Sequence, residues 1–199
     1  MKIGIDLDEV LAGFFESFIK YHNKNYGTAL RREMLRDYDI SKILGIDYDA
    51  LEPRLEDFYK SEEFKNIRPI EGAIESIPEI REGNELFIVT GRPSRFEKDT
   101  LGWINKHFPE TFKEVHFSDY DSVYPNEMDK GKNCKKLGLK FFIEDNLVYA
   151  AQCSKNGTRV LLFDAPWNKC SDELESQHRF IRVFSWRDIS NTIKMFSTF

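Results

Sequence analysis

The sequence has few cysteines, and nothing in their arrangement suggests a metal-binding domain or a disulfide framework. Cys134, Cys153 and Cys170 are an odd number in a chain of 199 residues, and no two of them form a CxxC pair. Reduced thiols fit this usage better than zinc ligands or structural disulfides do. The cysteine content therefore favours a cytoplasmic protein and argues against a small secreted module.

Long apolar runs and an excess of basic residues are also missing. No stretch approaches the ~20 apolar residues that a membrane-spanning helix needs, and Asp6 and Asp8 interrupt any signal-peptide pattern at the N-terminus. The net charge of −5 argues against nucleic acid as the main partner, because phosphate contacts need a basic face. We therefore expect a soluble protein with no membrane partner.

What the chain does contain is enough apolar material for a sizeable core, arranged in alternating short strands and helices. Hydrophobic residues make up 41% of the sequence, and 17 of them are phenylalanines. The expected strands are 3–7, 85–90, 112–117, 140–145, 159–163 and 180–184. Strands that alternate with helices predict an α/β fold with a Rossmann-like parallel sheet and right-handed crossovers.

One connection is much longer than a strand–helix–strand crossover requires. Roughly eighty residues separate the first two expected strands, whereas such crossovers are usually far shorter. Within this connection, the segments 11–26, 40–44, 48–59 and 62–64 have helical character. We therefore expect a small helical insertion at about 14–70, over the C-terminal end of the first strand. Pro53 and Pro78 are expected to bend or end the helices that contain them.

Polar residues follow several of the expected strands. Asp6 and Asp8 end the first strand, Thr90 the second, and Glu144 and Asp145 the fourth. Asp6 and Asp8 alone fit a surface strand end equally well. In a doubly wound sheet, however, all of these strand ends meet at one crevice.

The residue types at this crevice suit phosphate chemistry. Carboxylates from two strands form an oxygen-rich site of the kind that Mg²⁺ prefers. A threonine hydroxyl with nearby backbone N–H groups suits phosphate oxygens, and Lys130, on a basic helix before the fourth strand, adds a point charge. One aspartate could then act as a nucleophile, and the other could transfer protons.

The motifs resemble those of the haloacid dehalogenase (HAD) superfamily of phosphatases. Asp6-Leu7-Asp8-Glu9-Val10 is similar to its first motif and Thr90-Gly91-Arg92 to its second. Lys130 and Glu144-Asp145-Asn146 are similar to the third and fourth, in the same order and spacing. The stretches 69–73, 130–138 and 160–168 further resemble the 5'(3')-deoxyribonucleotidase branch, the cytosolic type C nucleotidases.

This resemblance implies a HAD core of residues 1–13 and 71–199 with a helical cap of residues 14–70. It implies a Mg²⁺-dependent phosphomonoester hydrolase, a 5'-nucleotidase that acts on (deoxy)ribonucleoside monophosphates through an aspartyl-phosphate intermediate. The expected catalytic residues are Asp6 as nucleophile, Asp8 as general acid and base, Thr90 and Lys130. The expected metal ligands are Asp6, Asp8 through its backbone carbonyl, and Glu144 with Asp145. The expected substrate-binding residues are Phe14, which would stack on the base, Thr90, Gly91, Arg92 and Lys130.

Several assignments stay open at this level. Position 9 is Glu where the superfamily often has Gly, and position 144 is Glu where the nucleotidases usually have Asp, so either Glu144 or Asp145 could be the inner metal ligand. Phe14 could equally be cap packing, and Lys132 is the alternative to Lys130. The rival functions are a phosphatase for a sugar phosphate or a nucleic-acid end, and a non-catalytic nucleotide-binding module. The oligomeric state, a homodimer included, is left open.

Overall fold

The protein folds around a six-stranded parallel sheet. The computed structural model describes residues 1–118, 129–170 and 172–197. The strands lie in the order β3-β2-β1-β4-β5-β6, and every neighbouring pair is parallel. They span β1 Lys2–Ile5, β2 Glu85–Thr90, β3 Glu114–Phe117, β4 Phe141–Glu144, β5 Arg159–Phe163 and β6 Ile181–Val183. The predicted α/β class with a parallel sheet is confirmed.

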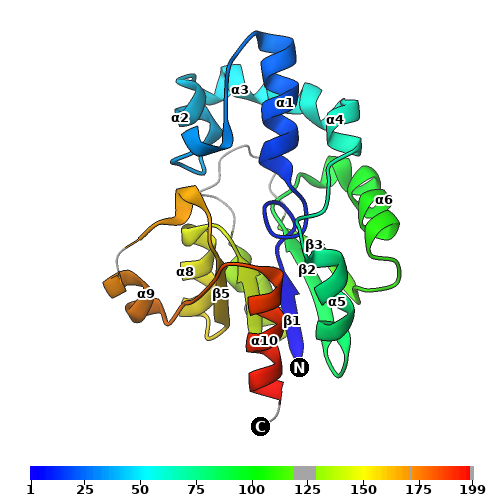
Figure 1. The fold of residues 1–199 in the computed structure, drawn as a ribbon, viewed down its shortest axis with the longest axis vertical. Coiled ribbons are helices and arrows are strands. Elements are labelled where there is room, and N and C mark those ends of the chain that lie inside the picture. The colour runs from blue at the N-terminus through cyan, green and yellow to red at the C-terminus, as the bar shows by residue number, and fades with distance from the viewer. Residues whose placement is uncertain (119–128, 171, 198–199) are drawn as a thin grey trace.

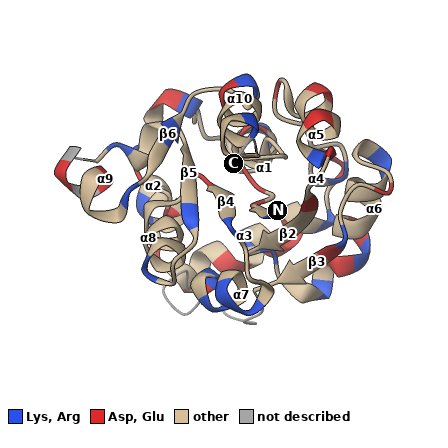
Figure 2. Ribbon diagram, turned by 90° about the horizontal axis from the view of Figure 1, so that it is seen from below, with Lys and Arg blue, Asp and Glu red and all other residues tan. Residues whose placement is uncertain are grey.

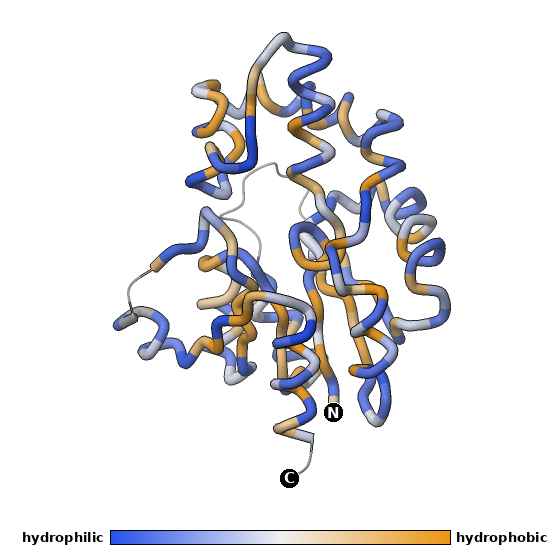
Figure 3. The backbone as a smooth tube through the Cα atoms, in the orientation of Figure 1, coloured by the Kyte–Doolittle hydropathy of each residue, from blue (hydrophilic) through white to orange (hydrophobic). Residues whose placement is uncertain are grey.

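Helices cover both faces of this sheet. Figure 2 shows α5 (Ala73–Arg81) and α10 (Trp186–Ser197) on one side, and α7 (Lys130–Leu137) and α8 (Leu147–Lys155) on the other. The remaining core helices are α6 (Glu97–His107) and α9 (Asp172–His178). Side chains alternate along the strands, so that Leu86 and Ile88 join one apolar cluster and Phe87 and Val89 the other. The strands form the apolar centre of Figure 3.

Four helices lie above the C-terminal edge of the sheet (Figure 1). They are α1 (Phe14–Tyr26), α2 (Ile40–Leu44), α3 (Tyr48–Lys60) and α4 (Glu62–Lys65), with a 3-10 turn at Arg32–Met34. The two connections to the sheet run side by side: the amide of Gly13 donates to the carbonyl of Arg68 at 2.9 Å, and Ile70 donates to Leu11 at 2.8 Å. The division of the chain into a core and a cap at these connections stays a prediction.

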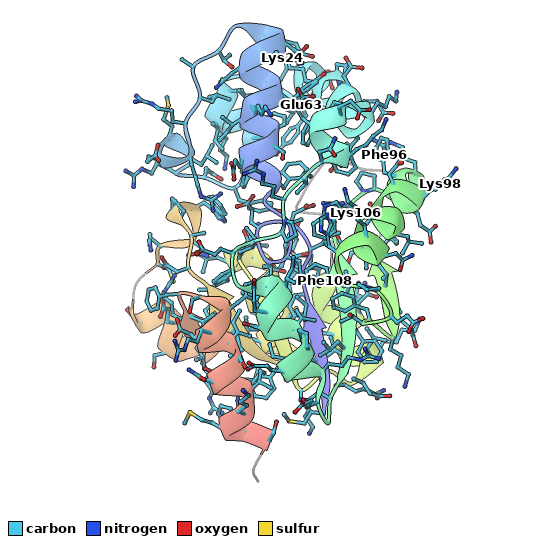
Figure 4. The ribbon with its side chains drawn as sticks, turned by 45° about the vertical axis from the view of Figure 1, so that its right-hand side comes forward. Lys24, Glu63, Phe96, Lys98, Lys106 and Phe108 are labelled. Atoms are coloured by element: carbon cyan, nitrogen blue, oxygen red, sulfur yellow. The ribbon has the colours of Figure 1, made fainter. Side chains whose placement is uncertain are left out.

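Aromatic packing holds these upper helices together. The ring of Phe58 on α3 meets Phe14 and Phe18 of α1 edge-on, with centroids 5.2 and 5.4 Å away, and Phe64 of α4 at 5.6 Å. On the surface, Lys24 of α1 lies beside Glu63 of α4 (Figure 4), at 3.2 Å. Phenylalanine rings therefore form much of the apolar contact between α1, α3 and α4.

Neither proline ends the helix that contains it: α3 continues through Pro53 and α5 continues through Pro78. Both prolines lie on the exposed side of their helix, where water can bond the carbonyl that has lost its N–H donor. In addition, β1 ends at Ile5 and α1 begins only at Phe14, so Asp8 belongs to a loop between them. Among the described residues, no helix combines the length and the apolar character that crossing a bilayer requires.

Candidate functional site

Three buried carboxylates gather where β1 and β4 end. Asp6 follows β1, Glu144 is the last residue of β4, and Asp145 comes next; β1 and β4 are paired neighbours in the sheet. One oxygen from each of these side chains lies within 4.8 Å of the other two. Asp6 is 2% exposed, and Glu144 and Asp145 are fully buried. The expected convergence of acids from two strands is present.

Lys130 supplies a buried ammonium group to this cluster. Its Nζ lies 2.8 Å from Oδ1 of Asp6 and 2.9 Å from Oε2 of Glu144. Burial acts to lower the pKa of Lys130, but the two adjacent carboxylates outweigh it and raise the pKa above its ordinary range. Lys132, by contrast, is exposed and pairs with Asp129, so Lys130 is the lysine that faces the carboxylates.

The close packing of two helices positions Lys130. Gly131, the next residue on α7, touches the backbone of α8, and a Cβ atom there would lie 2.5 Å from the carbonyl oxygen of Gln152. Only a glycine permits this approach without a shift of one helix. The ring of Tyr149 on α8 lies 4.7 Å from Nζ of Lys130 and covers the ammonium group.

The carboxylates carry more negative charge than Lys130 can balance. Burial raises the pKa of Asp6 well above its ordinary value, and the charge of Glu144 adds to this effect. The pKa of Asp145 is raised in the same way, first by burial and then by Glu144 and Asp6. Three acids facing one ammonium leave an excess of negative charge, which a divalent cation or bound protons would relieve.

Glu144 and Asp145 differ in what their oxygens contact. Oε2 of Glu144 meets Lys130, and its Oε1 accepts from the amides of Asp145 and Asn146 at 3.1 and 3.0 Å. Oδ2 of Asp145 accepts from the indole N–H of Trp167 at 2.8 Å. Its Oδ1 is buried and has no hydrogen-bond partner within the described part of the chain. Asp145 therefore has a free oxygen and Glu144 does not.

Asp8 and Thr90 flank the cluster, and Arg92 contacts both. The Arg92 guanidinium donates to both carboxylate oxygens of Asp8, through Nε at 3.0 and 3.2 Å and through NH2 at 2.6 Å. The backbone amide of Arg92 donates to the hydroxyl oxygen of Thr90 at 3.1 Å. The Thr90 hydroxyl proton remains available to donate to another group. Gly91 lies between Thr90 and Arg92 and lines the adjacent cavity.

Glu9 is accommodated by two contacts that the sequence did not indicate. Its backbone has a φ of 61°, a conformation that favours glycine. Its carboxylate accepts from the amide of Phe15 in the first turn of α1 at 2.6 Å and from Arg32 at 2.7 Å. Burial raises the pKa of Glu9, and Arg32 partly offsets that effect. Glu9 thus serves the N-terminus of α1, whose own capping residue, Gly13, has no side chain.

A cavity between the sheet and the upper helices opens onto these residues. Its floor includes Asp6 and Asp8, and Arg92 and Arg95 line one wall. The lining residues from the upper helices and their loops are aromatic or aliphatic: Phe14, Phe15, Tyr38, Ile40, Leu55 and Tyr59. Phe14 also packs against Phe58, so it serves both the packing of the upper helices and the cavity wall. Arg95 pairs with Glu56 of α3 at 3.0 Å.

The structure brings together every residue that the motifs predicted and adds three that they did not. Asp6, Asp8, Thr90, Lys130, Glu144 and Asp145 meet at one end of the sheet, and Phe14, Gly91 and Arg92 line the cavity above. The additions are Trp167, Arg32 and Tyr38. Trp167 belongs to the stretch 160–168, which resembles the nucleotidases. That resemblance pointed to the segment, but it did not predict the hydrogen bond between Trp167 and Asp145.

The fold and the site define a HAD-like hydrolase. A haloacid dehalogenase-like family hydrolase, SP0104 from Streptococcus pneumoniae, has the same fold, with a TM-score of 0.69 at 12% identity over 94% of this chain and 95% of that one. The family model described as 5' nucleotidase, deoxy (pyrimidine), cytosolic type C protein (NT5C) matches residues 1–197. The chain belongs to this family, which confirms the expected enzyme class, a phosphatase of the HAD superfamily.

Two relatives in the same class match nearly the whole chain. A 5'(3')-deoxyribonucleotidase of Bacillus subtilis is 26% identical over 201 residues, which cover 96% of this chain and 97% of the relative. Nucleotidase CA_C3379 of Clostridium acetobutylicum is 25% identical over 191 residues, which cover 95% and 91%. Both matches include the upper helices as well as the sheet.

Proposed function

We propose that the chain is a Mg²⁺-dependent phosphatase that hydrolyses (deoxy)ribonucleoside monophosphates through an aspartyl-phosphate on Asp6. The observation that carries the proposal is the buried cluster of Asp6, Glu144 and Asp145, with Lys130 as its ammonium group and a cavity above it. Membership in the nucleotidase family supports the substrate class.

The donor set fits a magnesium ion. Carboxylate oxygens are the ligands that Mg²⁺ prefers, and the free Oδ1 of Asp145 is a buried acceptor that needs a partner. Asp6 and Asp145 would hold the ion with the backbone carbonyl of Asp8, and Glu144 would anchor Lys130 from beside them. When bound, the ion would neutralise charge on the phosphate oxygens.

The residues divide the reaction between them. The Asp6 carboxylate attacks phosphorus, the bond to the ester oxygen breaks, and Asp8 gives its proton to the departing oxygen. Asp8 then takes a proton from a water molecule, which attacks phosphorus, releases inorganic phosphate and restores Asp6. Lys130 and the Thr90 hydroxyl hold the phosphate oxygens during both steps.

The cap region supports a nucleotide over a sugar phosphate. The cavity residues from the upper helices and their loops are aromatic or aliphatic, and such a surface suits the flat, apolar faces of a base. A sugar phosphate would be better served by carboxylates and lysines. Phe14 is the residue that we expect to stack on the base.

Replacement of the nucleophile tests the mechanism. Asp6→Asn should abolish hydrolysis of deoxynucleoside monophosphates, because the amide cannot form an aspartyl-phosphate, while circular dichroism shows an intact fold. Asp57→Asn, on the exposed side of α3, is the matched control and should keep full activity. Assays run with Mg²⁺ and with EDTA, on nucleoside and sugar phosphates, complete the test. Full activity in Asp6→Asn or in EDTA would contradict the proposal.

A further inference from the structure

The guanidinium of Arg92 contacts both oxygens of the Asp8 carboxylate. We infer that Arg92 is a positioning residue, which holds the carboxylate of Asp8 in the orientation that proton transfer to and from the substrate requires. The inference rests on the proposed function, because it concerns the residue that would transfer the protons.

The contact between the two side chains fixes a direction as well as a distance. Nε of Arg92 lies 3.0 and 3.2 Å from the two oxygens of Asp8, and NH2 lies 2.6 Å from Oδ1. A guanidinium that contacts both oxygens of a carboxylate sets the plane of that carboxylate, which a lysine cannot do. The pair joins residues 84 positions apart in the sequence.

Arg92 is itself held in place from the cap and from the core. Its side chain is 1% exposed, whereas that of Asp8 is 15% exposed. The guanidinium carbon lies 4.8 Å from the ring of Phe64 on α4 and 6.0 Å from the ring of Trp103 on α6. Enclosed between these rings, the guanidinium has little freedom to turn away from Asp8 towards a substrate.

Asp8 depends on this support because of where it lies in the chain. It stands in the loop between β1 and α1, beyond the regular hydrogen bonds of the strand. Within the described residues, every hydrogen bond to its carboxylate comes from Arg92. A displacement of about 1 Å in a reacting group can cost ~10²-fold in rate. Without Arg92, no other hydrogen bond in the described site would hold the Asp8 carboxylate in this orientation.

A direct role of Arg92 on the phosphate is the competing explanation. Its backbone amide contacts Thr90, and the residue lines the cavity. The two roles predict different kinetics. A residue that acts through Asp8 loses its importance once Asp8 can no longer transfer protons, whereas a residue that binds phosphate does not.

A double-mutant cycle separates these roles. The wild type, Asp8→Asn, Arg92→Met and the double variant are assayed in Mg²⁺ with a deoxynucleoside monophosphate and with p-nitrophenyl phosphate, whose good leaving group keeps slow variants measurable. We expect Arg92→Met to lower kcat by ~10²-fold with little change in KM. In the Asp8→Asn background, the same change should alter kcat by no more than about twofold. Arg92→Lys should recover part of the lost kcat, since lysine keeps the positive charge but cannot contact both carboxylate oxygens as the planar guanidinium does.

Each outcome bears on a specific claim. Equal losses in both backgrounds, or a loss mainly in KM, would show that Arg92 acts on the phosphate and would overturn the inference while the proposed function stands. Absence of Mg²⁺-dependent turnover in the wild type would overturn both. If Arg92→Met fails to fold, the cycle is run with Arg92→Lys and the double variant Asp8→Asn/Arg92→Lys. Lysine keeps a positive charge beside Asp8, so the carboxylate is not left without a cation in the single variant.

Discussion

At the scale of single residues, the candidate metal ligand is the acid that has a carboxylate oxygen without a hydrogen-bond partner in the described part of the chain. Glu144 and Asp145 are adjacent acids at the end of the same strand, yet Glu144 uses both of its oxygens on Lys130 and on backbone amides. Asp145 accepts a hydrogen bond from Trp167 through one oxygen, and its other oxygen has no partner among the described residues. The indole N–H of Trp167 therefore orients a candidate metal ligand through the oxygen that it contacts.

Replacement of Trp167 should weaken metal binding. Trp167→Phe removes the hydrogen bond to Asp145 and keeps a ring that can pack against Phe15. Loss of a partner that orients a ligand typically costs ~10–100-fold in metal affinity, and we expect a change of this size for Mg²⁺. Titration calorimetry with Mg²⁺ alone measures it. Trp186→Phe loses an equivalent bond to the carbonyl of Val10 and should leave Mg²⁺ affinity unchanged. Equal affinity in wild type and Trp167→Phe would refute this role.

At the scale of elements, the contact between α7 and α8 places the ammonium group in the site. The helices meet at Gly131, where the backbone of α8 leaves no room for a side chain. Lys130 precedes this contact and Tyr149 of α8 covers its Nζ. The spacing of these two helices is therefore coupled to the position of Lys130.

A methyl group at this contact should separate the helices. Gly131→Ala should lower the free energy of unfolding by about 1–3 kcal/mol, because the added Cβ meets a backbone carbonyl that cannot move alone. Activity should fall as well, because Lys130 shifts with α7. The matched control is Gly102→Ala on the exposed side of α6, where a Cβ meets nothing within 4 Å. This control should gain about 0.5–1 kcal/mol. Urea unfolding distinguishes the two, and a stabilised Gly131→Ala would contradict the packing argument.

At the scale of the whole molecule, negative charge is concentrated at one buried point. Lysines, arginines and acids are interspersed over the outer elements (Figure 2). The buried site instead holds three carboxylates with one lysine. Burial and mutual repulsion raise the pKa values of Asp6 and Asp145. The folded protein therefore binds protons that the unfolded chain has already released, and this site opposes folding as the pH rises.

The sign of this effect gives a test that needs no substrate. A carboxyl group whose pKa is raised on folding stabilises the fold at a pH below its unfolded value, and that contribution is lost as the pH rises through its folded pKa. Asp145→Asn removes one such group. In EDTA, the variant should therefore gain stability relative to the wild type as the pH rises above the ordinary aspartate pKa of about 4, by up to about 1.4 kcal/mol per pH unit.

Added Mg²⁺ should stabilise the wild type and reduce the advantage of Asp145→Asn, because the ion binds the ionised carboxylates of the folded state. Chemical unfolding at several pH values, with Mg²⁺ and with EDTA, measures both effects. A difference between the two proteins that does not change with pH would contradict the raised pKa of Asp145.

The sequence by itself determined the alternation of strands and helices, the long helical connection and the residues that close each strand. These features depend on local hydrophobic periodicity, and parallel strands necessarily present their C-terminal ends at one edge of the sheet. Pro53 and Pro78 do not end α3 and α5, because both lie on the exposed side of their helix, where the loss of one backbone hydrogen bond is tolerated.

Only the tertiary structure decided how the polar groups are paired. Arg92 reaches Asp8 across 84 positions of sequence, and Arg32 reaches Glu9 across 23. Lys130 and two backbone amides occupy both oxygens of Glu144, whereas Trp167 occupies only one oxygen of Asp145. Hydrogen bonds of this kind depend on distances of a few tenths of an ångström between elements far apart in the chain, and no local pattern in the sequence encodes them.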